Sequence, residues 1–172
     1  MALVTVVSTG ASIGTIIGQV LIVVLLIIGF VPNLRKSKTG QFIANRGSLF
    51  AFIVAIVATI ISLTYSEVIG FTPCRLCWFQ RIMIFPQVIL LGFAWFKGLG
   101  KSLKFSIITM ASIGVIISLR HYILQVSQAV SDCGADAVSC SANYSFHFGY
   151  ITIPMMALTT GLLIIILMWR TK

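Results

Sequence analysis

Four cysteines stand in two pairs whose spacing suits redox chemistry. Cys74 and Cys77 form a C-x-x-C motif, and Cys133 and Cys140 form a looser pair further along the chain. The thiolate is the reactive form of cysteine, and a helix N-terminus or nearby cations favour it. Two pairs on neighbouring segments can also hand a disulfide from one to the other. The spacing therefore favours a thiol relay.

The elements that carry these cysteines have the composition of a membrane protein. Of 172 residues, 59% are hydrophobic and only 9% are charged, whereas a soluble domain carries about 25% charged residues. A water-soluble fold would lack polar side chains for its surface, but membrane lipid can solvate an apolar one. The length suits a single domain, and we expect one membrane domain over residues 1–172.

Five apolar stretches are candidates for membrane-spanning helices, each of which needs roughly 20 residues. They are residues 13–31, 47–66, 82–96, 105–119 and 151–169. The predicted fold is all-α. It has a four-helix transmembrane bundle over 47–169, external loops at 67–80 and 127–150, and an additional N-terminal helix at 13–31.

The third and fourth stretches are too short to span a bilayer by themselves. Fifteen residues at about 1.5 Å of rise fall several ångströms short of about 30 Å of hydrocarbon. We therefore expect the third helix to begin near Cys77 and to include Arg81. The fourth should continue outward through Arg120 and His121. Three basic side chains then approach the same membrane boundary.

The distribution of Lys and Arg predicts the orientation, because these residues are retained in the cytoplasm. One side holds basic residues and no acid: Arg35, Lys36, Lys38, Arg46, Lys97, Lys101, Lys104, Arg170 and Lys172. The other side is neutral, so the whole net charge of +9 lies on the first and does not indicate nucleic-acid binding. We expect a multi-pass cell-membrane protein with its N-terminus outside and C-terminus inside. All four cysteines are then extracytoplasmic, where disulfides persist.

Arg81 is the basic residue whose position suggests chemistry. It lies one helical turn past Cys77, and a basic residue near the bilayer is costly and by default a functional-site hypothesis. Pro86 removes a backbone hydrogen bond further in and is predicted to kink the helix, which would shape a pocket for a polar, membrane-dissolved ring. Arg120 is explained equally well by snorkelling. His121 is interpreted more simply as an interfacial histidine than as a pocket residue.

Two other interpretations of the cysteines are open from the residues alone. Structural disulfides would close small rings that contribute roughly 2–2.5 kcal/mol each, which a helical bundle in lipid hardly needs. A four-cysteine zinc site fits the C-x-x-C motif but not the wider gap from Cys133 to Cys140, and oxidising surroundings compete for the thiolates. Asp132 also disfavours the thiolate of Cys133. Redox exchange remains the favoured interpretation, and no metal is expected.

The residues around the first pair resemble a known family. The run PCRLCWFQR at 73–81 is similar to the P-C-x-L-C-x-x-[QE]-R signature of the DsbB family of disulfide-generating membrane proteins. The runs RHY at 120–122 and FGYITIP at 148–154 resemble its Gram-positive branch, often called BdbC. The C-x-x-C pair comes first, unlike in the vitamin K epoxide reductases. The resemblance covers about 48–169, so the helix at 13–31 departs from the family's four spans and has an open purpose.

The resemblance implies a route for electrons. The protein would reoxidise a thioredoxin-fold, DsbA-like dithiol partner outside the cytoplasm and so support disulfide formation in exported proteins. Cys133 and Cys140 would form the disulfide that the partner attacks, with the mixed disulfide at Cys133. Cys140 would then exchange with Cys74.

The resemblance also implies a quinone cofactor, either ubiquinone or menaquinone. Cys77 would be the thiolate that reduces it, Arg81 would hold a quinone oxygen, and His121 would assist at the same pocket.

Two rival functions are compatible with the residues. One is an accessory or anchoring membrane protein whose cysteines form structural disulfides and take no part in redox exchange. The other is a reducing relay that carries electrons outward from a quinol. For a two-electron couple about 30 mV corresponds to about 1.4 kcal/mol. A modest change in the reduction potentials of the cysteine pairs would therefore reverse the direction of electron flow.

Overall fold

The structure is a computed structural model that describes residues 2–127, 140 and 148–171. Within these residues, five helices are long and apolar enough to cross a membrane. They are α1 (Ala2–Phe30), α3 (Lys38–Leu63), α4 (Arg75–Lys97), α5 (Lys101–Ser127) and α6 (Ile153–Arg170). A short helix, α2 (Pro32–Lys36), joins the first two, and a π-helical turn, η1 (Thr64–Val68), continues α3. The predicted all-α membrane fold with five spans is confirmed.

The helices run beyond the apolar stretches that predicted them. α4 begins at Arg75 and takes in Arg81, and α5 continues past His121 to Ser127. Backbone groups in lipid must be satisfied within the chain, so a helix does not end where the apolar side chains end. Pro86 lies inside α4, which continues as one helix on both sides of it.

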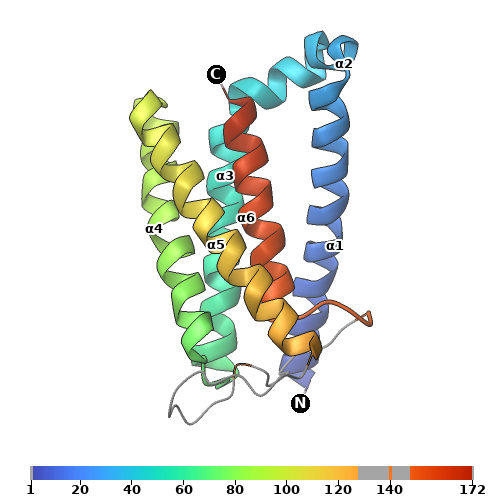
Figure 1. Cartoon of the computed structure of the whole chain (residues 1–172), viewed down its shortest axis with the longest axis vertical. Coiled ribbons are helices and arrows are strands. Elements are labelled where there is room, and N and C mark those ends of the chain that lie inside the picture. Colours follow the sequence, from blue (N-terminus) through green and yellow to red (C-terminus); the bar gives the residue numbers. More distant parts are fainter. Residues whose placement is uncertain (1, 128–139, 141–147, 172) are drawn as a thin grey trace.

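Helices α3, α4, α5 and α6 pack together as a bundle around one apolar core (Figure 1). Small residues let the helices approach closely, as is common between helices in membranes. A Cβ atom added at Gly161 of α6 would lie 2.7 Å from Val115 Cγ2 of α5. One added at Gly92 of α4 would lie 3.1 Å from Phe52 Cε2 of α3. These contacts place α4 and α5, which carry the candidate site residues, in fixed positions.

Helix α1 stands at the side of the bundle and packs mainly against α6 (Figure 1). A Cβ atom at Gly18 would lie 3.0 Å from Thr159 Cγ2 and 3.2 Å from Leu163 Cδ1. The Tyr150 hydroxyl donates a hydrogen bond of 2.7 Å to Gln19 Oε1, which ties α1 to the segment before α6. Gly14, one turn from Gly18, has no such neighbour within 4 Å. Of the two glycines in the G-x-x-x-G run, Gly18 therefore makes the helix–helix contact.

The two ends of the bundle differ in charge. The C-terminus, α2 and the turn from α4 to α5 lie at one end, and the N-terminus and the start of α4 lie at the other (Figure 1). The Lys104 ammonium donates a hydrogen bond of 2.6 Å to the Thr171 carbonyl at the first end. The basic segments predicted to share one side thus share one end of the fold, and the C-x-x-C motif lies at the opposite end.

Candidate functional site

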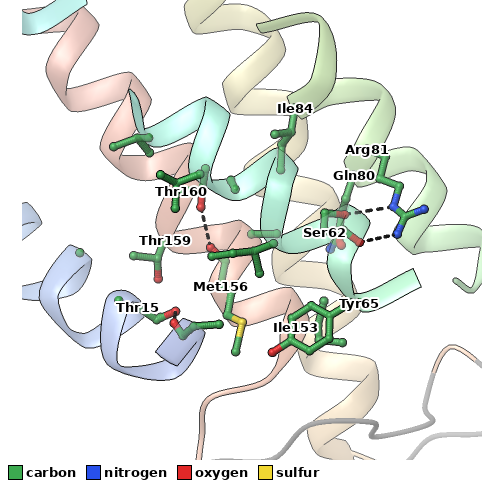
Figure 2. Close-up of a pocket in the computed structure, with 18 of the residues that line it drawn as sticks. Thr15, Ser62, Tyr65, Gln80, Arg81, Ile84, Ile153, Met156, Thr159 and Thr160 are labelled. Carbon is green, nitrogen blue, oxygen red and sulfur yellow. Dashed lines mark hydrogen bonds between the residues drawn. The ribbon is translucent and has the colours of Figure 1, made fainter. Parts of the chain in front are cut away.

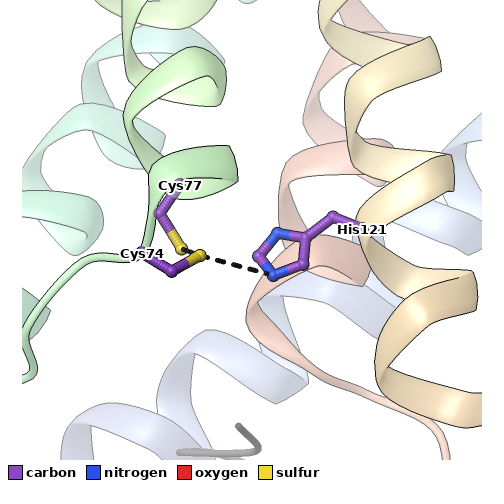
Figure 3. A group of neighbouring side chains, drawn as sticks. All are labelled: Cys74, Cys77 and His121. Atoms are coloured by element: carbon purple, nitrogen blue, oxygen red, sulfur yellow. Dashed lines mark hydrogen bonds between the residues drawn. The ribbon is translucent and has the colours of Figure 1, made fainter. Parts of the chain in front are cut away.

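The first cysteine pair lies at the N-terminus of α4. Cys74 is the residue that caps the helix, with extended backbone (φ −71°, ψ 171°), and Cys77 lies in the first turn. Both are free thiols, and their sulfur atoms are 3.1 Å apart (Figure 3). A disulfide brings two sulfurs to about 2.05 Å, so the pair needs only a small movement to oxidise. Cys74 is buried and Cys77 is half-buried.

His121 connects the first pair to Cys140. Its side chain is fully buried on α5, with Nε2 3.7 Å from Cys74 Sγ and 3.1 Å from the carbonyl oxygen of Cys140. A carbonyl oxygen only accepts, so Nε2 carries the proton. The other ring nitrogen, Nδ1, then accepts from Gln80 Nε2 at 3.4 Å. The single Nε2 proton, which faces both the Cys140 carbonyl and the Cys74 sulfur, is therefore carried by a ring that Gln80 holds through Nδ1.

The second pair is only partly described. Cys140 is buried and disulfide-bonded, whereas Cys133 lies outside the described residues. A disulfide sulfur is not a thiolate ligand, so Cys140 does not complete the four-cysteine zinc site that the sequence left open. The donor atoms of Cys74, Cys77 and His121 do lie within 4.8 Å of one another.

The surroundings of Cys74 favour its thiolate. The hydrogen bond from Cys77 is the main cause, and it lowers the pKa of Cys74 from about 9 to about 4, with His121 adding to the shift and burial opposing it. The position at the start of α4 acts in the same direction, because a helix N-terminus favours negative charge. Cys74 is thus the thiolate that contacts His121, and His121 in turn contacts the Cys140 carbonyl.

We expect the ultraviolet thiolate absorbance of the reduced first pair to persist down to a pH near 4, because the folded protein holds the pKa of Cys74 at about 4. His121→Ala should move the midpoint of this titration upward, since one donor to the thiolate is lost. The midpoint should stay below the ordinary value of about 9, because the larger contribution from Cys77 remains.

The titration is made with Cys133 and Cys140 replaced by alanine, so that only the first pair contributes. Arg120→Ala is the matched control, because Arg120 is exposed and its neighbour His121 is buried. An unchanged midpoint in His121→Ala would mean that His121 does not stabilise the Cys74 thiolate.

Arg81 is buried rather than extended to the membrane surface. Its Nε donates to Ser62 Oγ at 3.1 Å and its NH2 donates to the Ser62 carbonyl at 2.9 Å. The guanidinium carbon lies 5.4 Å from the ring centre of Trp78 and 6.0 Å from that of Phe85. Within the described residues the one acid is Glu67, which accepts a hydrogen bond from Ser66. Arg81 is therefore a fixed cation in apolar surroundings.

An apolar cavity of about 290 Å³ begins beside Cys77, Gln80 and Arg81. Its walls come from α1, α3, α4 and α6, and Figure 2 shows Arg81 on one side of it and Thr15 of α1 on the other. The volume is just below the range of about 300–1,000 Å³ for ligand pockets, which are also apolar with a few polar groups. The donors of Gln80 and Arg81 suit a ring carbonyl oxygen and the apolar walls suit a lipid tail, so these residues fit a membrane quinone.

The structure gathers five of the six predicted site residues at one end of the bundle: Cys74, Cys77, Arg81, His121 and Cys140. They divide into two groups. Cys77 and Arg81 line the cavity, whereas Cys74 and Cys140 are linked through the His121 ring. His121 was predicted to assist at the cavity, but it does not line it. Sequence reasoning assigned no role to Gln80 or Ser62. Gln80 stands in the quoted motif, three residues after Cys77, whereas Ser62 has no sequence signal.

Comparison with known proteins gives consistent matches. A family model described as "Disulfide bond formation protein DsbB" matches residues 44–169. "Disulfide bond formation protein C" of Bacillus subtilis (strain 168) is 42% identical over 125 residues, covering 71% of this chain and 89% of the relative. "Probable disulfide formation protein C 1" of Bacillus anthracis is 43% identical over 110 residues, covering 63% and 78%. "Probable disulfide formation protein" of Chlamydia pneumoniae is 35% identical over 134 residues, covering 77% and 96%. No solved structure matches the chain.

Proposed function

The chain belongs to the DsbB family of disulfide bond formation proteins, and from this membership we propose that it passes electrons from an extracytoplasmic dithiol protein to a membrane quinone. The resemblance seen in the sequence is thereby confirmed, and the protein is a membrane oxidoreductase that generates disulfides. One observation carries the finer proposal. Cys74 contacts His121, which also contacts the Cys140 carbonyl, whereas Cys77 lines the apolar cavity. The first pair thus has a thiol-exchange side and a membrane side.

The exchange side would receive electrons from a reduced thioredoxin-fold, DsbA-like partner. A partner thiolate attacks the Cys133–Cys140 disulfide at Cys133 and forms a mixed disulfide. The second partner thiol then resolves the mixed disulfide. The partner is left with a disulfide, and Cys133 and Cys140 are left as thiols. Cys140 next attacks an oxidised first pair at Cys74, and Cys133 resolves that bond. Two electrons and two protons move at each exchange. The support is His121, which contacts both Cys74 Sγ and the Cys140 carbonyl.

The membrane side would hold the acceptor. A quinone bound there supplies the two-electron oxidant that converts the dithiol of Cys74 and Cys77 back to a disulfide. Arg81 and Gln80 would hold a ring oxygen, and the apolar walls would keep water from the reacting sulfur. Ser62 positions Arg81 through two hydrogen bonds, so the guanidinium does not need to reorganise when charge develops.

We also propose that the basic end of the bundle lies in the cytoplasm, because Lys and Arg near spans are retained there. Single cysteines placed at Lys36 and Lys101 in a cysteine-free background should be protected from a membrane-impermeant thiol reagent in intact cells. A cysteine placed at Asp136 should react. An N-terminal tag that is shielded from outside would contradict the five-span orientation.

The proposed function is tested by turnover of the purified protein. We expect a reduced thioredoxin-fold dithiol protein to be oxidised while the absorbance of added quinone falls in equal molar amount. An anchoring protein with inert disulfides would leave both unchanged. A reducing relay would instead reduce the oxidised partner when supplied with quinol, and the ratio of the two rates distinguishes these directions.

A further inference from the structure

Helix α1 contributes a wall to the cavity although it lies outside the family match. The match covers residues 44–169, and α1 ends at Phe30. Six residues of α1 nevertheless line the cavity: Ala11, Gly14, Thr15, Ile17, Gly18 and Leu21. The cavity that begins at the redox residues is therefore closed on its far side by an element that the family relationship does not explain.

The wall that α1 presents is apolar. Thr15 is the one residue with a hydroxyl among the α1 residues that line the cavity. Its hydroxyl donates to the carbonyl of Ala11 at 2.8 Å, so its proton is used inside the helix and does not face the cavity as a donor. The polar groups that suit a ring oxygen stand on α4, across the cavity. The cavity is therefore polar at its α4 end and apolar along α1, the pattern expected for a ligand with a polar head and a hydrocarbon tail.

Gly14 is the position on this wall where a side chain is most clearly absent. It lines the cavity, and a Cβ atom added there would meet nothing within 4 Å. Gly18, one turn later, is different because α6 lies against it at 3.0 Å. Gly18 therefore serves helix packing, whereas Gly14 leaves open space in the cavity.

We propose that α1 is the tail-binding wall of the quinone site and that Gly14 is a specificity-determining residue for the isoprenoid tail. The proposal rests on the proposed function, because it takes the ring to be held beside Cys77 and Arg81. A cavity of about 290 Å³ does not enclose a long tail, so the tail must leave along an apolar wall. The side chain at position 14 would set how much room the tail has there.

The experiment compares quinones that share a ring and differ in the tail. The probes are menaquinone with tail-less menadione, and ubiquinone with its tail-less benzoquinone. For each probe the Kd is measured from quenching of tryptophan fluorescence, since Trp78 lies beside Arg81, and the KM is measured in turnover. Gly14→Phe should raise the Kd ratio of long-tailed to tail-less quinone about tenfold. The added ring would take the open space that the tail needs, and overpacking of this kind costs enough for a factor of that size.

Gly10→Phe is the matched control, because Gly10 lies one turn earlier on the same helix, is exposed, and does not line the cavity. It should leave the ratio as in the wild type. Gly14→Leu is a smaller second variant should the phenylalanine variant not fold, and it should shift the ratio in the same direction.

The outcomes separate the two proposals. A wild-type protein that reduces tail-less quinone supports the proposed function whatever happens at Gly14. An unchanged ratio in both Gly14 variants, or an equal loss of affinity for long-tailed and tail-less probes, would overturn the role of α1 alone. A wild-type protein that binds and reduces no probe would overturn the proposed function and this inference with it.

Discussion

Cys77→Ala is expected to abolish quinone reduction with every dithiol donor. A lone thiol at Cys74 cannot form the intramolecular disulfide that releases two electrons, and Cys77 is the sulfur that lines the cavity. Cys140→Ala should behave differently. It should abolish oxidation of the protein partner, while dithiothreitol still drives quinone reduction through the intact first pair. The measurement is quinone absorbance with the protein partner and with dithiothreitol, for each variant.

Comparing the protein partner with dithiothreitol as electron donor separates the role of the second cysteine pair from that of the first. Cys133→Ala should match Cys140→Ala, because either change removes the second disulfide. Normal turnover in Cys77→Ala would contradict the relay as drawn. Loss of dithiothreitol-driven turnover in Cys140→Ala would mean that the second pair is needed for quinone reduction itself, and that the two pairs do not act in series.

The spans were predictable because their cause is local. A bilayer demands a long apolar run, and each of the five runs is visible in the sequence. The ends of the spanning helices could not be predicted in the same way. Helix α1, for example, starts at Ala2 rather than at residue 13. The polar residues before that point do not interrupt it, since Ser8 and Ser12 bond to carbonyls of their own helix. Apolar length sets a minimum for a helix in lipid, and backbone hydrogen bonding sets its real extent.

The candidate site was predictable only where its residues share a local pattern. The spacing from Cys77 to Arg81 places both on one helix face, and both line the cavity. His121 was harder, because its contacts come from α4 and from Cys140, which are distant in sequence. The sequence therefore favoured an interfacial histidine, whereas the structure buries it against Cys74. No local pattern could have shown that α1 lines the cavity, since that follows from how α1 packs on α6.

Arg81→Met should reduce the rate of quinone reduction by about a hundred- to a thousandfold, the loss found when a donor that stabilises developing charge is removed. Arg81 is suited to that role because it is buried and lines the cavity beside Cys77. Its two hydrogen bonds to Ser62 and its ring contact with Trp78 fix the guanidinium. A cation held in place before the reaction needs no reorganisation when negative charge appears on an acceptor oxygen.

The measurement is steady-state quinone reduction at several quinone concentrations, with dithiothreitol as donor so that the second pair does not limit the rate. Arg81→Lys keeps the charge but loses the planar fork that spans both atoms of Ser62, so it should lose less than Arg81→Met. Ser62→Ala keeps the guanidinium and removes one of its two acceptors, so its defect should be smaller still. Thermal unfolding checks that each variant is folded. Full activity in a folded Arg81→Met would mean that Arg81 only packs α4 against α3, and that the acceptor binds elsewhere.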